Sequence, residues 1–393
     1  MDWQAHAAAL ADATVHPDSL WHPAIAATPR HLFVPRWWRQ LPDLGWTLRA
    51  GADEPDRWMN AAYSNRTLVT RVGDLHADHA QPDDHPTGLP TSSSTLPGLI
   101  VALFDHALLT DHTNVLCVTG SGYGTALLAH RLTDTAVTSI DIDPYLVSAA
   151  THRLGVTGLH PYLEVRDITG ELPGRHDRII STVALPGIPP TWLAALNDHG
   201  RLVTNLAGTG LILVADKTPD GGARGQIAPD HAGFMATRAG TDYPPQPGNR
   251  HAWTDDGETV TTGRYPVIQV AETWELMSAM ALAVPGIRHS YTEEDGVRTA
   301  VMSHPDGSWA RATGRRGEAP TVHQTGPRPL WDTLDAIRHD WLSDGYLPVY
   351  GATATIDPDG TLHLTRRNWT TVIPPPEPIV RPRGADSALG TPP

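Results

Sequence analysis

The chain of 393 residues carries 29 Lys and Arg against 43 Asp and Glu, a net charge of −14, and 40% of its residues are hydrophobic. This length favours two or three domains of roughly 150 residues each, and the apolar content excludes a wholly disordered chain. The acidic balance disfavours broad binding to nucleic acid or to anionic membrane surfaces.

Targeting and redox signals are sparse. The longest strictly apolar run, residues 99–104, is far shorter than the roughly 18 residues that span a bilayer. No basic segment followed by an apolar one begins the chain, so no signal peptide is expected. The single cysteine, Cys117, excludes an internal disulfide and a multi-cysteine zinc site. These features predict a cytoplasmic enzyme without a membrane or nucleic-acid partner.

Glycine and proline cluster in stretches that resist regular structure and divide the chain. We expect five segments: a lead-in at 1–90, a core at 91–216, a Gly/Pro-rich linker at 217–262, an α+β domain at 263–373 and a disordered tail at 374–393.

In the core, apolar strand patterns alternate with helical ones. The expected order is a helix at 99–109, a strand at 115–118, a helix at 125–132, a strand at 137–142, a helix at 144–154, and strands at 162–165, 178–181 and 201–206. This alternation predicts an α/β fold, with right-handed βαβ units and helices on both faces of a parallel sheet.

The back of the chain has a different pattern. Its expected elements are strands at 265–270, 299–303, 308–312, 352–356 and 361–365 and a helix at 330–342. Turn signatures at 304–307 and 357–360, both with Pro-Asp-Gly, join two of the strand pairs. The pattern predicts a small α+β module.

The strongest chemical signal is Gly120-Ser121-Gly122-Tyr123-Gly124, between a predicted strand and a predicted helix. Glycines allow a tight turn and close backbone approach to a ligand, and the helix N-terminus favours an anionic group. The next strand ends in Asp141-Ile142-Asp143, where a carboxylate can accept both ribose hydroxyls. We therefore expect a nucleoside-containing cofactor; the alternative is a plain glycine turn beside a surface acid.

The spacing of the glycines narrows the choice of cofactor. The third glycine comes one residue early for the dinucleotide motif, and no Gly-Lys-Ser/Thr marks a P-loop. S-adenosylmethionine needs only a turn, an acid for ribose and a polar group near adenine. Asp167, just after the third strand, suits the last role, and its alternative is a turn-forming aspartate.

Several short motifs follow one another in a specific order. They are 30–35 (Arg-His-Leu-Phe-Val-Pro), 92–95 (Ser-Ser-Ser-Thr), 115–129, 140–143, Asp167, 177–180, 188–189 and 200–203. In this order, residues 28–216 resemble the protein-L-isoaspartate O-methyltransferases. The additional domain, the serine run and the helix at Trp331 resemble a longer branch of that family, found beside enzymes of graspetide or lanthipeptide maturation.

The resemblance implies a Rossmann-like S-adenosylmethionine-dependent methyltransferase core with an additional C-terminal α+β domain, and a lead-in that faces a peptide. By position, it implies cofactor contacts from Gly120, Ser121, Gly122, Tyr123, Asp141, Ile142 and Asp167, and catalytic serines at Ser94 and Ser93. Substrate contacts are expected from Ser92, Thr95 and Trp37, although an N-cap role for the serine run and a core role for the tryptophan are the alternatives.

The implied activity is esterification of an aspartyl or isoaspartyl carboxylate in a ribosomally made, modified peptide, with later collapse of the ester to an aspartimide. One alternative is repair of isoaspartyl proteins. A second is a peptide-binding relative without catalysis, because Leu116-Cys117-Val118-Thr119 replaces the acid and extra glycine usual in the family.

Two other features have simpler interpretations. A histidine- and aspartate-rich stretch at 76–85 could bind a metal, but we expect a solvated loop and predict no metal. Cys117 is expected to be a buried thiol rather than a nucleophile.

Overall fold

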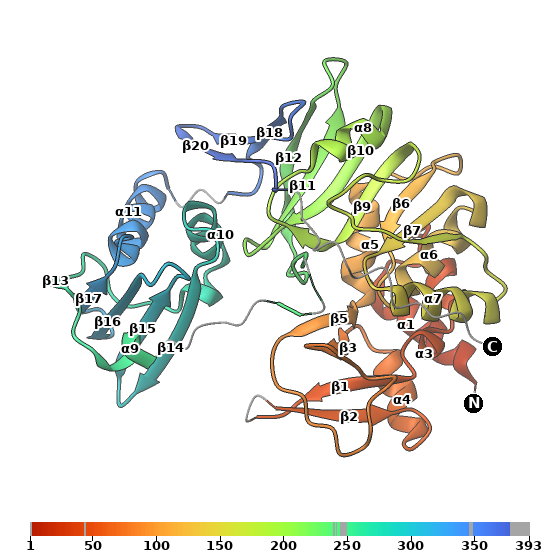
Figure 1. Cartoon of the computed structure of the whole chain (residues 1–393), viewed down its shortest axis with the longest axis horizontal. Helices are drawn as coiled ribbons and strands as arrows, with labels where there is room; N and C mark the ends of the chain where they lie inside the picture. Colours follow the sequence, from red (N-terminus) through yellow and green to blue (C-terminus); the bar gives the residue numbers. More distant parts are fainter. Residues whose placement is uncertain are drawn as a thin grey trace.

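The computed structural model describes residues 2–42, 45–238, 240, 242–243, 250–345 and 349–377. Its strands form a central ten-stranded sheet flanked by two five-stranded sheets, one from the N-terminal part and one from the back of the chain (Figure 1). Within these ranges no helix is long and apolar enough to cross a membrane.

The central sheet carries the predicted alternation of strand and helix. Its core elements are α5 (Pro97–His106), β6 (Val115–Val118), α6 (Tyr123–Arg131), β7 (Val137–Asp141), α7 (Pro144–Val156), β8 (Tyr162–Val165), β9 (His176–Leu185), α8 (Pro190–Ala195) and β10 (Leu196–Leu206). A 3-10 turn, η1 (Asp134–Ala136), precedes β7. The parallel order β10-β9-β6-β7-β8 is that of an α/β sheet, as predicted.

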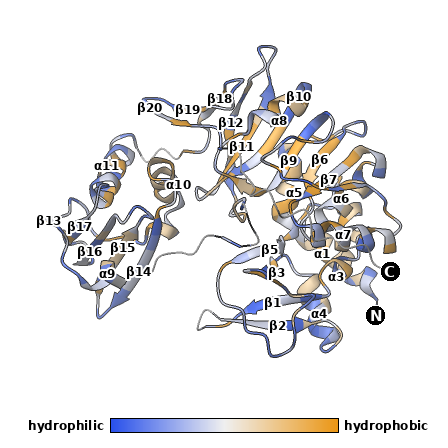
Figure 2. Ribbon diagram, viewed as in Figure 1, coloured by the Kyte–Doolittle hydropathy of each residue, from blue (hydrophilic) through white to orange (hydrophobic). Residues whose placement is uncertain are grey.

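Strand β6 shows why the parallel part is buried on both faces. Its four apolar residues alternate between two hydrophobic clusters, Val115 and Cys117 on one face and Leu116 and Val118 on the other. Helices α5 and α6 cover the first face and α8 covers the second. Figure 2 shows the apolar residues concentrated in these central strands. A strand buried on both faces reads as a continuous apolar run, which is why the sequence revealed it.

Antiparallel strands extend the same sheet beyond β10. They are β11 (Leu211–Lys217), β12 (Ala223–His231), β18 (Thr353–Ile356), β19 (Leu362–Arg366) and β20 (Trp369–Ile373). Two predicted boundaries therefore differ from the structure: β12 lies inside the predicted linker, and 353–373 belong to the central sheet rather than to the C-terminal module. Backbone pairing of β12 with β18 decides both points, because it joins segments more than 120 residues apart.

The N-terminal part forms its own sheet and a helical cover. The elements are α1 (Trp3–Thr14), α2 (His22–Ala27), α3 (Arg30–Phe33), β1 (Arg36–Gln40), β2 (Trp46–Ala50), α4 (Pro55–Ala62), β3 (Leu68–Val72), β4 (Leu75–His76) and β5 (Pro90–Ser94). Strand β5, which contains the serine run, pairs with β3. The predicted boundary at 90/91 thus cuts an element that belongs to the N-terminal sheet.

The third sheet and its helices form the C-terminal module. Its elements are α9 (Arg250–Thr254), β13 (Thr259–Thr262), η2 (Val270–Glu272), α10 (Trp274–Ala283), β14 (Arg288–Glu294), β15 (Val297–Ser303), β16 (Trp309–Arg315), β17 (Thr321–Thr325) and α11 (Leu330–Ser343). Both Pro-Asp-Gly turns join antiparallel strands, β15 to β16 and β18 to β19, as predicted.

The strand predicted at 265–270 does not form. Pro266 cannot donate to a sheet ladder, and its carbonyl accepts a hydrogen bond from Arg338 of α11. Val267 and Val270 instead pack into the core of the module. The predicted disordered tail lies outside the described residues from 378 onward.

Candidate functional site

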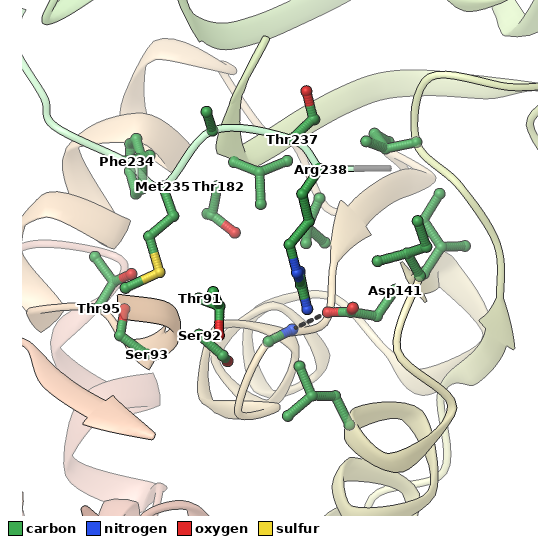
Figure 3. A pocket seen from close by; sticks show the side chains of 18 of the residues that line it. Thr91, Ser92, Ser93, Thr95, Asp141, Thr182, Phe234, Met235, Thr237 and Arg238 are labelled. Atoms are coloured by element: carbon green, nitrogen blue, oxygen red, sulfur yellow. Dashed lines mark hydrogen bonds between the residues drawn. The ribbon is translucent and has the colours of Figure 1, made fainter. Parts of the chain in front are cut away.

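A cavity of about 150 Å³ lies at the carboxyl ends of the parallel strands, where they meet β5 of the N-terminal sheet (Figure 3). Three segments line it. The sheet wall consists of Gly120, Asp141, Ile142 and Asp167. The serine wall consists of Thr91, Ser92, Ser93 and Thr95. The strap consists of residues 233–238. Clefts at the carboxyl ends of parallel strands are the usual ligand sites of α/β sheets.

The glycine turn and the acid of the next strand converge in this cavity, as the sequence predicts. The backbone N–H of Gly120 donates to Oδ2 of Asp141 at 3.0 Å. Gly120 has φ +50°, and a Cβ built on it lies 3.6 Å from the carbonyl oxygen of Ser93. The turn therefore brings bare backbone against both the acid and the serine wall.

Gly122 serves packing instead. It caps α6 with φ +90°, and a Cβ there would lie 3.0 Å from Cβ of Ala150 and 3.3 Å from the ring of Phe33. It does not line the cavity.

Asp141 is the partly buried acid of the sheet wall. Its Oδ1 accepts the backbone N–H of Asp143 at 3.0 Å, and its Oδ2 accepts that of Gly120. Burial raises the pKa of Asp141 to about 6, although both hydrogen bonds and the charge of Arg238 act in the opposite direction. Each oxygen keeps a lone pair beside the cavity, which suits a ligand with two neighbouring hydroxyls.

Cations surround the neighbouring Asp143. Its Oδ2 lies 2.9 Å from Nε2 of His76, 3.5 Å from Nη1 of Arg71 and 3.8 Å from Nη2 of Arg238. Burial alone would raise the pKa of Asp143, but the hydrogen bond and charge of His76 and the charge of Arg71 hold it below its usual value. Asp143 also caps α7 by accepting the N–H of Tyr145. It is a structural acid, held ionised at the cavity margin.

Asp167 forms a turn, the alternative given for it above, and its role at adenine stays a prediction. Its Oδ1 accepts the N–H and the hydroxyl of Thr169, at 2.8 and 2.7 Å, so the residue forms a turn. It also lines the cavity next to Ile168.

The serine wall corrects the ranking of the predicted catalytic residues. Ser92, Ser93 and Thr95 line the cavity, whereas Ser94, the first choice from sequence, does not. The Ser94 side chain is 1% exposed, and its Oγ has no hydrogen-bond partner among the described residues. Ser92 is buried and accepts a hydrogen bond from Thr70, whereas Ser93 is partly exposed, so Ser93 is the more accessible candidate on this wall.

Arg30 holds the end of β5 in place, a role the sequence did not reveal. Its buried guanidinium donates to the carbonyls of Ser94 and Thr95 and also to those of Ala62, Ser64 and Arg66. Desolvation lowers the pKa of Arg30 to about 10, so it remains a cation. A guanidinium suits this position, because it stays charged and its five N–H donors can satisfy several carbonyl oxygens at once.

The strap was missed because it falls within the predicted linker. Ala184 at the end of β9 donates to the carbonyl of Met235 and accepts from the N–H of Thr237, at 2.8 and 2.9 Å. The strap thus pairs with β9 and passes over the cavity, and Arg238 reaches from it toward Asp141 (Figure 3). The apolar pair Phe234-Met235 within a Gly/Pro-rich stretch is the one sequence signal for it.

The other predicted residues lie away from the cavity. Ser121 is buried in the turn, and Tyr123 is buried beside Arg30, 5.3 Å from the guanidinium to the ring centroid. Trp37 is 7% exposed and lines a separate groove on the N-terminal sheet. Cys117 is buried, as predicted, and burial raises the pKa of its thiol to about 11.

The stretch at 76–85 is a solvated loop only in its second part: residues 81–83 and His85 are exposed, as predicted, whereas His76 and Asp78 are docked. Asp78 accepts hydrogen bonds from Tyr145 and Arg153 of α7, and His76 binds Asp143. These contacts dock the first part of the stretch on α7. The described residues contain no group of three or more side chains able to hold a metal ion.

Comparison with known proteins agrees with this geometry. Residues 83–227 match the family described as protein-L-isoaspartate(D-aspartate) O-methyltransferase. Two curated protein-L-isoaspartate O-methyltransferases match the chain: one from Korarchaeum cryptofilum is 34% identical over 103 residues, and one from Xanthobacter autotrophicus is 36% identical over 116 residues.

These matches are partial. They cover 23% and 28% of the chain and 47% and 51% of the two relatives, so the chain spans about half the length of the curated relatives it matches. Among solved structures, a protein-L-isoaspartate O-methyltransferase aligns over 94% of the chain and 98% of its own length, with a TM-score of 0.47 and 16% identity. A Plasmodium falciparum protein described as a putative member, in complex with S-adenosyl-L-homocysteine, aligns over 61% of the chain and 99% of its own, with a TM-score of 0.40 and 10% identity.

S-adenosyl-L-methionine is the cofactor that the methyltransferase domain implies, and the cavity has the groups to hold it. Gly120 offers a turn without a side chain, and Asp141 offers two acceptor oxygens for ribose. Asp167 lies on the same wall for the adenine amino group. The volume of about 150 Å³ is below the roughly 300–1,000 Å³ of most ligand sites, because the strap and Arg238 fill part of the space.

Proposed function

We propose that the chain is an S-adenosyl-L-methionine-dependent O-methyltransferase that esterifies an aspartyl or isoaspartyl carboxylate of a peptide. The observation that carries the proposal is the convergence of Gly120, Asp141 and Ser93 on one cavity within a methyltransferase domain.

The chemistry makes few demands on the protein. When bound, S-adenosyl-L-methionine supplies a methyl carbon, to which the carboxylate oxygen bonds as the carbon–sulfur bond breaks and its electron pair stays on sulfur. No proton moves, so the cavity needs no general base. The work left to the chain is to orient the carboxylate and exclude water, and such positioning lowers the barrier substantially.

Ser93 is proposed to hold the oxygen of the substrate carboxylate that does not react. A serine hydroxyl donates a hydrogen bond without protonating its acceptor, so the nucleophile stays ionised. The carbonyl oxygen of Ser93 lies 3.6 Å from a Cβ built on Gly120, and both residues line the same cavity.

The finer proposal concerns the substrate. We expect a ribosomally made, modified peptide, whose methyl ester then loses methanol to the neighbouring backbone nitrogen to form an aspartimide. The support is architectural: the N-terminal sheet and the C-terminal module add surface around a core that is shared with smaller relatives. Repair of isoaspartyl proteins is the alternative.

The test is methyl transfer from labelled S-adenosyl-L-methionine to synthetic peptides that differ only in aspartate against isoaspartate, linear or cyclised. Methyl gain followed by methanol loss on a cyclised aspartyl peptide supports maturation. Methylation of the linear isoaspartyl peptide alone supports repair. Failure to bind S-adenosyl-L-homocysteine in calorimetry contradicts both and supports the peptide-binding relative without catalysis.

A further inference from the structure

A second groove opens on the N-terminal sheet beside the cavity. It has a volume of about 520 Å³ and lies between β1, β2, the start of β3 and α4. Three buried tryptophans are among its lining residues, Trp37 and Trp38 from β1 and Trp46 from β2. We call it the arginine groove after the four arginines that line it: Arg39, Arg49, Arg57 and Arg66.

The charge of the groove is opposite to that of the whole chain. Against four arginines its lining contains one carboxylate, Glu54, whereas the chain as a whole has a net charge of −14. Glu54 is already shared by Arg49 at 3.2 Å and Arg57 at 3.1 Å. In the described part of the chain, no carboxylate lies within 4.0 Å of Arg39 or Arg66. Both side chains belong to exposed residues, so their charges face solvent.

The groove is continuous with the cavity. Thr67 lines both of them. Arg66, which lines the groove, and Thr95, which lines the cavity, are also neighbours: Nη2 of Arg30 donates to the carbonyl oxygens of both, at 3.0 and 3.1 Å. A peptide whose target carboxylate enters the cavity beside Thr95 therefore places its neighbouring residues near Arg66.

We propose that the arginine groove binds acidic residues that flank the methylated residue, so that the substrate is an acidic peptide. This inference rests on the proposed function. Guanidinium groups bind carboxylates with two parallel hydrogen bonds and are the usual partners of acidic side chains at binding surfaces.

The molecule offers a contrasting surface as a control. A groove of about 560 Å³ between α10, α11 and β20 is lined by Glu275, Asp340 and Asp344 with a single arginine, Arg366. It is similar in size and opposite in charge, and it shares no lining residue with the cavity. Charge complementarity therefore favours binding of an acidic peptide to the arginine groove and disfavours its binding to the second groove.

The test reverses the charge of the two exposed arginines without a carboxylate partner. Arg39→Glu combined with Arg66→Glu is compared with Arg224→Glu combined with Arg316→Glu, which changes the net charge equally at exposed positions of β12 and the β16–β17 turn. Substrates are two peptides of equal length with one target residue, flanked by glutamates or by serines. We expect the groove variant to raise KM for the glutamate peptide about tenfold and to leave kcat and the serine peptide nearly unchanged.

Two results overturn the inference. One is an equal change in KM for the glutamate and serine peptides in the groove variant. The other is an equally large rise in KM for the glutamate peptide in the control variant. High salt should also weaken binding of the glutamate peptide to the wild-type protein, because salt screens exposed charges. It should not weaken binding to the groove variant.

Direct binding separates failure of this inference from failure of the proposed function. Fluorescence anisotropy of a labelled glutamate-rich peptide needs no methyl transfer. Binding by the wild type and loss in the groove variant support the groove even if neither peptide is methylated. Equal affinity for a single-stranded oligonucleotide of the same charge overturns the assignment to a peptide.

Discussion

The sheet wall and the serine wall of the cavity are built in different ways. The sheet wall comes from the carboxyl ends of the parallel strands β6, β7 and β8, so each residue is placed by its own strand. The serine wall comes from an N-terminal sheet, and Arg30 holds its end through carbonyls of distant segments. The sheet wall has the features of a nucleoside site that many α/β proteins share. The serine wall is instead supplied by the N-terminal sheet of this chain.

This contrast predicts a division of labour. Changes in the sheet wall should alter affinity for the cofactor, and changes in the serine wall should alter turnover without altering that affinity. The variants below test this division from the largest expected effect to the smallest.

Asp141→Ala should have the largest effect. It removes the acceptor for both ribose hydroxyls and the two backbone hydrogen bonds that shape the turn, so affinity for S-adenosyl-L-homocysteine should fall at least roughly hundredfold. Calorimetric titration measures it, with a thermal melt to show that the variant is folded. Unchanged affinity in a folded variant would show that Asp141 does not bind the cofactor, and it would contradict the division of roles between the two walls.

Ser93→Ala should lower kcat roughly tenfold while the affinity for S-adenosyl-L-homocysteine stays the same. Ser94→Ala is the matched control, because the Ser94 side chain is buried and lies outside the cavity lining. Steady-state methylation assays compare the two. A slower Ser94 variant beside an unaffected Ser93 variant would restore the ranking expected from sequence.

The pH dependence of cofactor binding is a smaller effect. The pKa of Asp141 is raised to about 6 by burial, and only the ionised form accepts two hydroxyls. Affinity for S-adenosyl-L-homocysteine should therefore be at its maximum at about pH 8, where Asp141 is ionised, and should be roughly fourfold lower at about pH 5.5. A titration series in calorimetry gives the midpoint. A flat profile over this range would mean that the Asp141 carboxylate is not the ribose acceptor.

Arg238→Gln should shift that midpoint. The charge of Arg238 lowers the pKa of Asp141, so removing the charge raises the midpoint and strengthens the loss of affinity at acidic pH. The same calorimetric series, run on the variant, tests it. A midpoint that stays in place would show that the strap does not bring its charge to the acid when the cofactor is bound.

Much of the fold follows from residues whose information is local. The buried strand at 115–118 and the glycine turn after it were predicted, because an apolar run and a tight turn are properties of neighbouring residues. The strand predicted at 265–270 does not form, because Pro266 lacks the N–H that a sheet ladder needs even though apolar residues flank it. Strands β12 and β18 to β20 could not be assigned to one sheet from sequence, since nothing local encodes a pairing across more than 120 residues.

For the site, the sequence by itself determined the sheet wall: a glycine that can take φ +50° and an acid that ends the next parallel strand meet because parallel strands present their carboxyl ends at one edge. Only the tertiary structure decided that Ser93 rather than Ser94 faces the cavity, since the pairing of β5 with β3 sets which side chains turn inward. It also decided that the strap closes over the acid and that the arginines of the N-terminal sheet lie beside the cavity, because both depend on contacts between segments far apart in the chain.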